Sequence, residues 1–396
     1  MNSQKKLSLF SPRFGEGAPK GVKLVLLSFF SLGILFLFWH GIHGKCNACD
    51  FHHRYDIGIL IRHGLAPAEF ADVPRSDLPK MGLPPNFAPQ HIDFPWTQSV
   101  FAVFSLFPRT LALTLFRILQ AACLIFCIAA SVHYLTAKFH IERLSASVLV
   151  LFFYLSLYIR TDVNVGNLGL VSLAGIFLLY YGWDRKKSWL EAVGLTLLCM
   201  KPQTGFLFIL LLMFDKHIAA LVWTGVYSFL ISIPLMLYLH KIPWDFFVKM
   251  VSVRYTFSTL PQTCGLFGIF YQPHIQQLTM AGNAIVTVGI LFFYLYRYPV
   301  KDPMLRLLPA AVGTLCWSYL RIYHFLFLII PLLCLAGMLK ESAEEGKSSC
   351  MIVFLMFLLW LPVGQHVPTC IFFMKFLISF FSLFYIGHYF GRTRPL

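Results

Sequence analysis

Runs of apolar residues, several of them about 20 residues long, follow one another along most of the 396-residue chain and are separated by short polar segments. A helix of that length crosses the hydrocarbon core of a bilayer. The spacing does not fit the alternating segments of about ten residues that form outer-membrane barrels. Hydrophobic residues make up 58% of the chain and charged residues 12%, which excludes an ordinary soluble domain. The sequence therefore predicts an all-α polytopic integral membrane protein.

Basic residues gather in the short segments between the apolar runs. Several precede the first expected span (22–42), and residues 184–187 carry the clearest cluster. Because cytosolic loops are enriched in Lys and Arg, we expect the basic tail (1–21), the 184–187 segment and the carboxy-terminus to lie in the cytosol. This rule also accounts for the formal charge of +15, so we expect no nucleic-acid partner.

The polar segments divide a single expected transmembrane domain, residues 22–396, into about twelve crossings. The expected spans are 22–42, 110–137, 145–160, 166–183, 188–200, 203–214, 217–239, 280–296, 305–320, a span ending at Met338, 349–364 and 370–388. A large first outer loop (43–95) and a second outer loop (240–279) interrupt them, and within the first loop we expect a short interfacial helix over residues 55–64. The apolar segment 96–108 is too short for a crossing, so we expect it to be re-entrant.

Polar and ionisable residues are distributed unevenly between the two sides of this topology. On or near the outer face we expect Asp50, Asp56, Asp93, Asp162, Lys201, Asp245, Arg254, Arg321, Tyr323, His324 and His366. A charged side chain at membrane depth costs about 2.5 to 3.5 kcal/mol on insertion scales, so such residues usually line a cavity or a pathway. The active side is therefore expected to be the non-cytosolic one.

Asp50 follows the first span and is the first candidate for chemistry. A partly buried carboxylate at this place suits a general base that accepts the proton of an incoming hydroxyl. The alternative is a boundary residue that caps the next helix.

Lys201, Arg254 and Arg321 are the basic candidates. A cation near the membrane plane would stabilise a leaving phosphate, although a lone basic residue at a helix end commonly snorkels to lipid headgroups. Lys201 precedes a proline between two short apolar runs, which predicts a break that exposes this residue to a cavity. His324 would bind the phosphate or position the acceptor, or serve as a structural hydrogen-bonding residue.

Motifs for metals and nucleotides are missing from the sequence. It contains no His-x-x-x-His pair near a Glu, no Gly-rich phosphate loop and no Gly-x-Ser-x-Gly, so we expect no cofactor. Cys46 and Cys49 lie on the outer side, where a disulfide would stiffen the approach to Asp50. One compact Cys-x-x-Cys with the neighbouring His pair is a weak zinc signal.

The order of these features resembles the multi-spanning glycosyltransferases of the GT-C fold, and most nearly glycosyltransferase family 87, whose members use polyprenol-phosphate mannose. Asp50-Phe51 is similar to the catalytic Asp of that family, and Lys201-Pro202 matches its Lys-Pro. Tyr323-His324 resembles its late aromatic-His pair. Gly166-Asn167 stands where the family has Gly-Gln, and Tyr55 follows the Asp by five residues instead of four. Asp56 either has no family equivalent or is a rival base.

This resemblance implies transfer of a hexose, with mannose the first expectation, from a polyprenyl-phosphate sugar to a hydroxyl of a lipid or glycan acceptor, with inversion. Asp50 would be the base, and Lys201 with Arg254 or Arg321 would hold the phosphate. Asn167, Tyr323 and His324 would line the same site. The polyprenyl tail would enter from the bilayer, and a bacterial plasma membrane is the expected location.

Three alternatives remain open on the sequence alone. A GT-C transferase for another polyprenyl-phosphate sugar, such as arabinofuranose, has the same signature. A secondary transporter or lipid flippase also has about twelve spans and broken helices, but it predicts paired repeats and charges at the midplane, and the charges here lie to one side. The third alternative is a non-catalytic assembly partner.

Overall fold

The computed structural model describes residues 19–44, 48–66, 73–85, 87, 93–242, 276–315, 322–346, 348–361 and 369–393. Its helical elements are α1 (Lys20–Ile42), α2 (Cys49–Arg62), η2 (Pro79–Met81), α3 (Pro95–Phe104), α4 (Arg109–Phe139), α5 (Arg143–Tyr154), α6 (Leu157–Val165), α7 (Gly169–Asp184), α8 (Ser188–Leu198), α9 (Pro202–Phe214), α10 (Ile218–Leu239), α12 (Gln276–Arg297), α13 (Pro303–Gly313), η6 (Ile322–Leu328), α14 (Ile329–Glu344), α15 (Cys350–Trp360) and α16 (Thr369–Thr393). The prediction of an all-α polytopic membrane protein is confirmed.

Helix length varies widely among the expected spans. Of the described helices, α1, α4, α10 and the continuous helix of η6 and α14 are each long and apolar enough to cross a membrane, and the pair α5–α6, bent by 56°, makes a fifth candidate. The remaining apolar helices in the described chain, among them α7, α8, α9 and α15, are 10–17 residues long. The predicted count of about twelve crossings therefore depends on these shorter helices.

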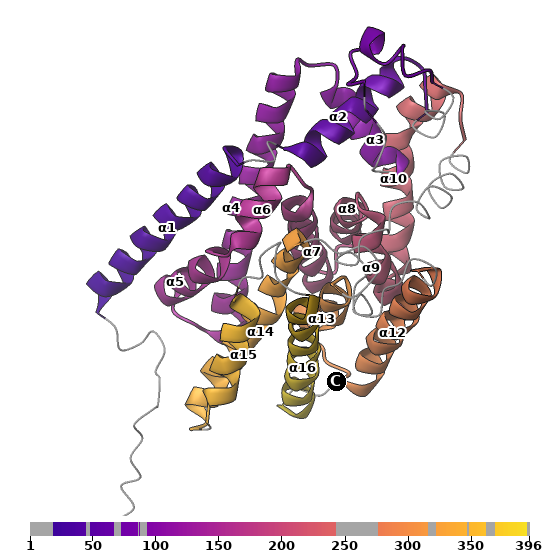
Figure 1. The fold of residues 1–396 in the computed structure, drawn as a ribbon. Helices are drawn as coiled ribbons and strands as arrows, with labels where there is room; N and C mark the ends of the chain where they lie inside the picture. The colour runs from indigo at the N-terminus through magenta and orange to yellow at the C-terminus, as the bar shows by residue number, and fades with distance from the viewer. Residues whose placement is uncertain are drawn as a thin grey trace, which may run out of the picture.

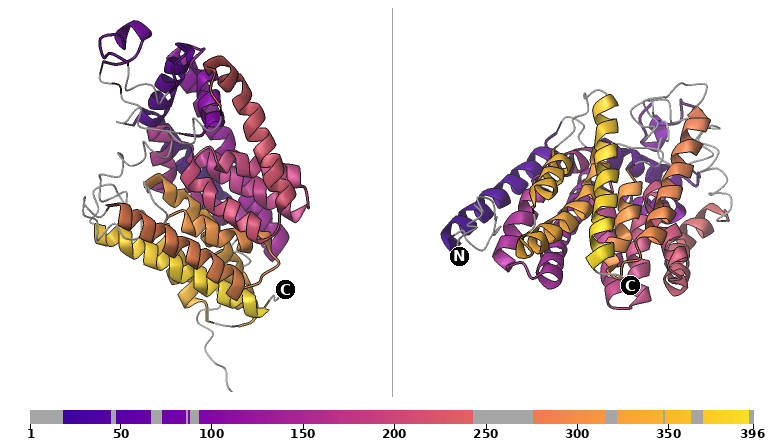
Figure 2. Two further views of the ribbon diagram at one scale, coloured as in Figure 1. Left: turned by 90° about the vertical axis from the view of Figure 1, so that its right-hand side faces the viewer. Right: turned by 90° about the horizontal axis from the view of Figure 1, so that it is seen from below.

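The helices differ in how deeply they are buried, and this reveals the layers of the fold. The apolar window of the η6–α14 helix is 89% buried, whereas that of α1 is only 17% buried. Apolar side chains of α1, α4 and α10 are exposed over long stretches, as expected for helices that face lipid. Helices α2 and α3 lie at the end of the molecule opposite α16 (Figure 1), and α12 to α16 lie together on one side (Figure 2).

Helices α7 and α8 pack closely because glycines line their crossing. A Cβ built on Gly194 would lie 2.5 Å from the carbonyl oxygen of Gly175, so larger residues would push the helices apart. The two helices are antiparallel, connected through Arg185–Lys187. Consequently the end of α8 lies beside the beginning of α7, and the break between α8 and α9 lies beside the turn between α6 and α7.

The first outer loop contains a longer helix than the sequence suggested. We expected a short helix over residues 55–64, but α2 begins at Cys49. The cause is tertiary: Ala48 adopts a left-handed conformation (φ 61°) and its backbone N donates to the carbonyl oxygen of Asn164 at 2.7 Å. The earlier start places Asp50 in the first helical turn.

The segment expected to be re-entrant is a short helix. Helix α3 has 10 residues, ends at Phe104 and packs against α2 and α10. Pro108, which lacks the backbone N–H that a helix interior needs, then precedes α4. Most of the second outer loop, residues 243–275, lies outside the described residues.

A lysine inside α16 binds the end of α15. Nζ of Lys375 donates to the carbonyl oxygens of Leu358 at 2.7 Å, Leu359 at 2.6 Å and Leu361 at 2.7 Å. An ammonium has three donors, and the last carbonyls of a helix have no partner within it. The one side chain therefore satisfies three backbone groups that water does not reach in a bilayer.

Candidate active site

The start of α2 packs closely against the turn between α6 and α7. Gly166 adopts a left-handed conformation (φ 66°) in this turn, and a Cβ on it would lie 2.7 Å from the Cβ of Phe51. Glycine is needed for both the conformation and the close approach. The contact places the next residue, Asn167, beside Asp50.

Asp50 accepts a hydrogen bond from the side chain of Asn167. Nδ2 of Asn167 donates to Oδ2 of Asp50, while Oδ1 of Asn167 accepts from the backbone N of Leu168 at 2.6 Å. The amide of Asn167 thus has a fixed orientation. Ala48 occupies the cap position of α2, and no side-chain cap is found there among the described residues. The carboxylate of Asp50 is turned to Asn167.

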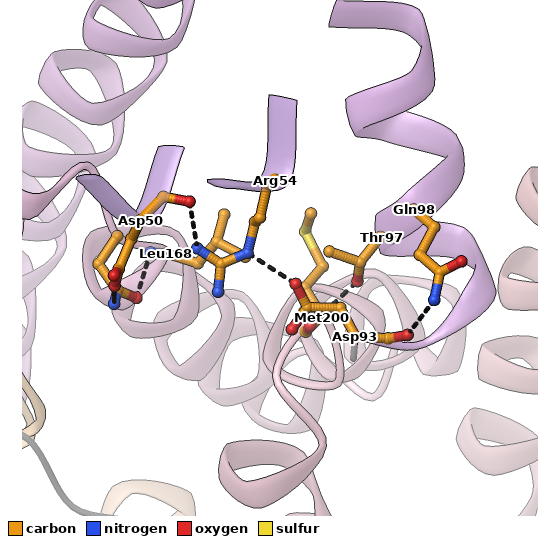
Figure 3. Close-up of polar contacts among 8 residues, drawn as sticks. Asp50, Arg54, Asp93, Thr97, Gln98, Leu168 and Met200 are labelled. Atoms are coloured by element: carbon orange, nitrogen blue, oxygen red, sulfur yellow. Dashed lines mark hydrogen bonds and ion pairs between the residues drawn. The ribbon is translucent and has the colours of Figure 1, made fainter. Parts of the chain in front are cut away.

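Arg54 connects α2 to the segment before α3. One turn after Asp50, its Nε donates to Oδ2 of Asp93 at 2.6 Å and its Nη1 to the carbonyl oxygen of Asp50 at 3.5 Å (Figure 3). Nε2 of Gln98 donates to the carbonyl oxygen of Asp93 at 2.8 Å. Both members of the Arg54–Asp93 pair are nearly inaccessible to solvent, so the pair is screened little by salt.

Lys201 lies at the break between α8 and α9 and is 2% exposed. The hydroxyl of Thr97 donates to the carbonyl oxygen of Met200 at 3.0 Å, which ties α3 to the break (Figure 3). The charge of Lys201 interacts with those of Arg54, Asp162, Asp50 and Asp93. The predicted break at Lys201-Pro202 is thus present.

A second buried carboxylate, Asp162, supports the α6–α7 turn. Its oxygens accept hydrogen bonds from the backbone N of Gly169 at 3.0 Å and of Leu170 at 3.1 Å. These groups belong to the first turn of α7, where backbone N–H groups have no helical partner and negative charge is favourable. Asp162 holds the turn that carries Asn167.

Asp56 pairs with an arginine at the start of α4. Its Oδ1 accepts a hydrogen bond from Nη2 of Arg109 at 2.5 Å, and the hydroxyl of neighbouring Tyr55 donates to the carbonyl oxygen of Phe107 at 2.8 Å. Burial raises the pKa of Asp56 to about 6, although the charge of Arg109 opposes this. The rival base named from the sequence is therefore paired with α4.

The structure brings three of the predicted residues together: Asp50, Asn167 and Lys201. His324 is buried in η6, which packs against α6 and α7. Arg254, Arg321 and the side chain of Tyr323 lie outside the described residues, as does Cys46, so those predictions stay predictions.

Some polar residues of this site were not identified from the sequence. Arg54 was missed, although its spacing of four residues from Asp50 puts the two on one helix face. Arg117 and Gln120 were also missed because they lie inside an apolar run that predicts an ordinary span. An arginine inside such a run is a signal in its own right.

A cavity of about 570 Å³ adjoins the site. It is mainly apolar and lies between the start of α3 and helices α8, α9 and α10. Its lining includes Phe94, Trp96, Cys199, Gly225 and Met236. Phe94 directly follows Asp93, so one end of the cavity lies near the Arg54–Asp93 pair.

Comparison with known proteins gives one match. The family model named Glycosyltransferase family 87 matches residues 95–331, which is more than half of the chain. The matched segment contains Asn167, Lys201 and His324 and begins after Asp50. No curated protein and no solved structure matches the chain.

Proposed function

Because the chain belongs to glycosyltransferase family 87, and is therefore a membrane glycosyltransferase, we propose that it moves a hexose from a polyprenyl-phosphate sugar to a hydroxyl of a lipid or glycan acceptor. Mannose is the proposed sugar, and the anomeric centre is inverted. The reaction takes place on the non-cytosolic face of a bacterial plasma membrane, with both termini in the cytosol.

Asp50 is the base in this proposal. The acceptor oxygen attacks C1 of the sugar while its proton passes to the carboxylate, and the bond between C1 and the phosphate oxygen breaks on the opposite side. A positioned general base contributes about 10² to 10⁴ in rate. The hydrogen bond from Asn167 to Oδ2 of Asp50 orients the carboxylate for this role.

Lys201 holds the leaving phosphate, together with Arg254 or Arg321. As the bond to C1 breaks, negative charge grows on the phosphate oxygens. A fixed cation in a site shielded from water stabilises that charge strongly. Lys201 is buried and electrostatically coupled to Asp50, which supports a phosphate position close to the base. Asn167, Tyr323 and His324 complete the proposed substrate contacts.

The cavity between α3, α8, α9 and α10 takes the prenyl chain of the donor. Its lining is mainly apolar, and large apolar side chains of α10 and α9, among them Phe229 and Met213, are exposed where lipid would contact them. A chain that enters there has its phosphate end near Arg54 and Lys201. This relative position supports the donor, instead of a free lipid, as the occupant.

One observation carries the proposal: an acid from the first outer loop, a buried amide from the α6–α7 turn and a buried lysine from the α8–α9 break gather at one place. A buried lysine is costly. Their assembly from distant parts of the chain indicates a functional site.

Sugar transfer by the full chain in proteoliposomes tests this function. The donor is polyprenyl-phosphate mannose and the acceptor an alkyl mannoside. We expect Asp50→Asn to lower the rate by about 10² or more, with Asp184→Asn as the matched control, since Asp184 is exposed at the end of α7.

Each other outcome removes one part of the proposal. Unchanged transfer by Asp50→Asn removes Asp50 from the mechanism. Transfer from the arabinofuranosyl donor but not the mannosyl donor changes the sugar. Substrate uptake driven by an ion gradient, without transfer from either donor, replaces the transferase by a transporter.

A further inference from the structure

Arg117 is a buried cation inside a helix that is long and apolar enough to span the membrane. It lies eight residues after the first residue of α4, about 12 Å along the helix axis, and it is 7% exposed. Among the described residues, its Nε and Nη2 have no hydrogen-bond acceptor. A buried charge held in this way costs free energy, so its presence calls for an explanation other than stability.

The one described hydrogen bond of this guanidinium fixes the orientation of a side-chain amide. Nη1 of Arg117 donates to Oε1 of Gln120 at 3.1 Å. A guanidinium has no acceptor, so the oxygen of Gln120 must face it and the NH2 group must face away. Nε2 of Gln120 then donates to the carbonyl oxygen of Asn167 at 3.0 Å and, more weakly, to that of Asp162 at 3.5 Å.

The orientation of Gln120 affects the proposed base through Asn167. Gln120 holds the backbone of the α6–α7 turn at Asn167, and the side chain of Asn167 donates to Asp50. Gln120 and Asn167 are fully buried, so water does not compete for these bonds. The contacts thus run from Arg117 through Gln120 to the backbone of Asn167, whose side chain donates to Asp50.

We infer that Arg117 is a positioning residue for sugar transfer: by orienting Gln120, it holds the backbone of the α6–α7 turn at Asn167, whose side-chain amide donates to Oδ2 of Asp50. This inference rests on the proposed function, because it takes Asp50 as the base. Arg117 touches no reacting atom in this role. The free-energy cost of burying Arg117 is explained by this role, since without the cation only the carbonyl oxygens of Asn167 and Asp162 orient the amide of Gln120.

Other charged groups also face Asp50 and must stay in place during the test. They are Arg54 on α2, Asp162 on α6 and Lys201 at the α8–α9 break. Arg54 and Lys201 favour the ionised carboxylate, and Asp162 opposes it. Substitution of Arg117 keeps these three residues in place, but it also removes the attraction between Arg117 and Asp162.

The experiment measures transfer against pH, together with thermal unfolding, for the full chain in proteoliposomes with polyprenyl-phosphate mannose. For Arg117→Met we expect transfer to fall by about 10²-fold. The acid limb of the pH–rate profile moves up by about one unit, because the ionised base loses one stabilising donor. The unfolding temperature stays the same or rises, since an apolar residue replaces a buried charge with two nitrogens that are unsatisfied in the described chain. Arg143→Met, at the exposed start of α5, is the control.

Two further variants separate orientation from structure. Arg117→Lys keeps a donor to Gln120 and should recover part of the rate. Gln120→Glu has the same shape and still accepts from Arg117, but it cannot donate to the carbonyl of Asn167, so it should lose transfer as Arg117→Met does.

The outcomes distinguish this inference from the proposed function. If Asp50→Asn abolishes transfer but Arg117→Met keeps the wild-type rate and acid limb, the inference is wrong and the function stands. If Arg117→Met lowers the unfolding temperature and the rate without moving the acid limb, the role of Arg117 is structural. If Asp50→Asn transfers normally, the proposed base is wrong, and the inference fails with it.

Discussion

Oδ1 of Asp56 and Nη2 of Arg109 lie 2.5 Å apart and join the middle of α2 to the first residue of α4. This pair keeps Asp56 away from the group around Asp50. Burial nevertheless raises the pKa of Asp56 from 3.8 to about 6, so the folded protein binds a proton there more tightly than the unfolded chain does.

The raised pKa predicts a pH dependence of stability. Between about pH 4 and pH 6 the folded state keeps a proton that the unfolded state has lost, so stability should fall as pH rises through this window and level off above it. Asp56→Asn should weaken the dependence. Thermal unfolding of the detergent-solubilised protein from pH 4 to pH 7 measures the pH dependence of stability in both proteins. A wild-type stability that rises across the same window would show that Arg109 outweighs burial.

Gly166 sets the position of Asn167, and its substitution should uncouple Asn167 from Asp50. Gly166→Ala meets the strain of a left-handed alanine, about 1–2 kcal/mol, and a Cβ contact at 2.7 Å with Phe51, which adds about 1–3 kcal/mol. Both the unfolding temperature and the rate of transfer should fall. Gly346→Ala is the matched control, because Gly346 has φ 67° and open space around it. Equal losses of transfer in both variants would contradict the role given to the Phe51 contact.

Gly225 offers a test of the cavity. It lines the cavity and has open space at its Cβ position, so Gly225→Leu fills that space. If the burial of two methylene groups of the donor is lost, affinity falls about tenfold. KM should therefore rise for a long-chain donor and less for a short-chain prenyl donor. Gly289→Leu, also in open space but on α12, should leave both KM values unchanged. A uniform change for both donors would remove the prenyl chain from this cavity.

The sequence was most informative where one local pattern determines the structure. Long apolar runs predicted helices such as α1 and α10, and Lys201-Pro202 predicted the break between α8 and α9. These features follow from helix length and from the missing N–H of proline, which do not depend on the rest of the fold.

Features that depend on tertiary contacts were not predictable in this way. The early start of α2 depends on the bond between Ala48 and Asn164, whose partners are far apart in the sequence. The partners of Arg54 and Gln120 likewise come from other segments. Hydrophobic periodicity identifies helices but does not say which polar residues of different helices meet.

The bonds of Lys375 have a consequence for biosynthesis. The ribosome adds Leu358, Leu359 and Leu361 to the chain before Lys375. The three carbonyl groups that accept hydrogen bonds from Lys375 are therefore already present when this lysine is added. The ammonium of Lys375 can therefore enter the lipid while it is hydrogen-bonded to α15, so it is not inserted as an unsolvated charge. This order of synthesis allows α15 and α16 to enter the membrane as a joined hairpin.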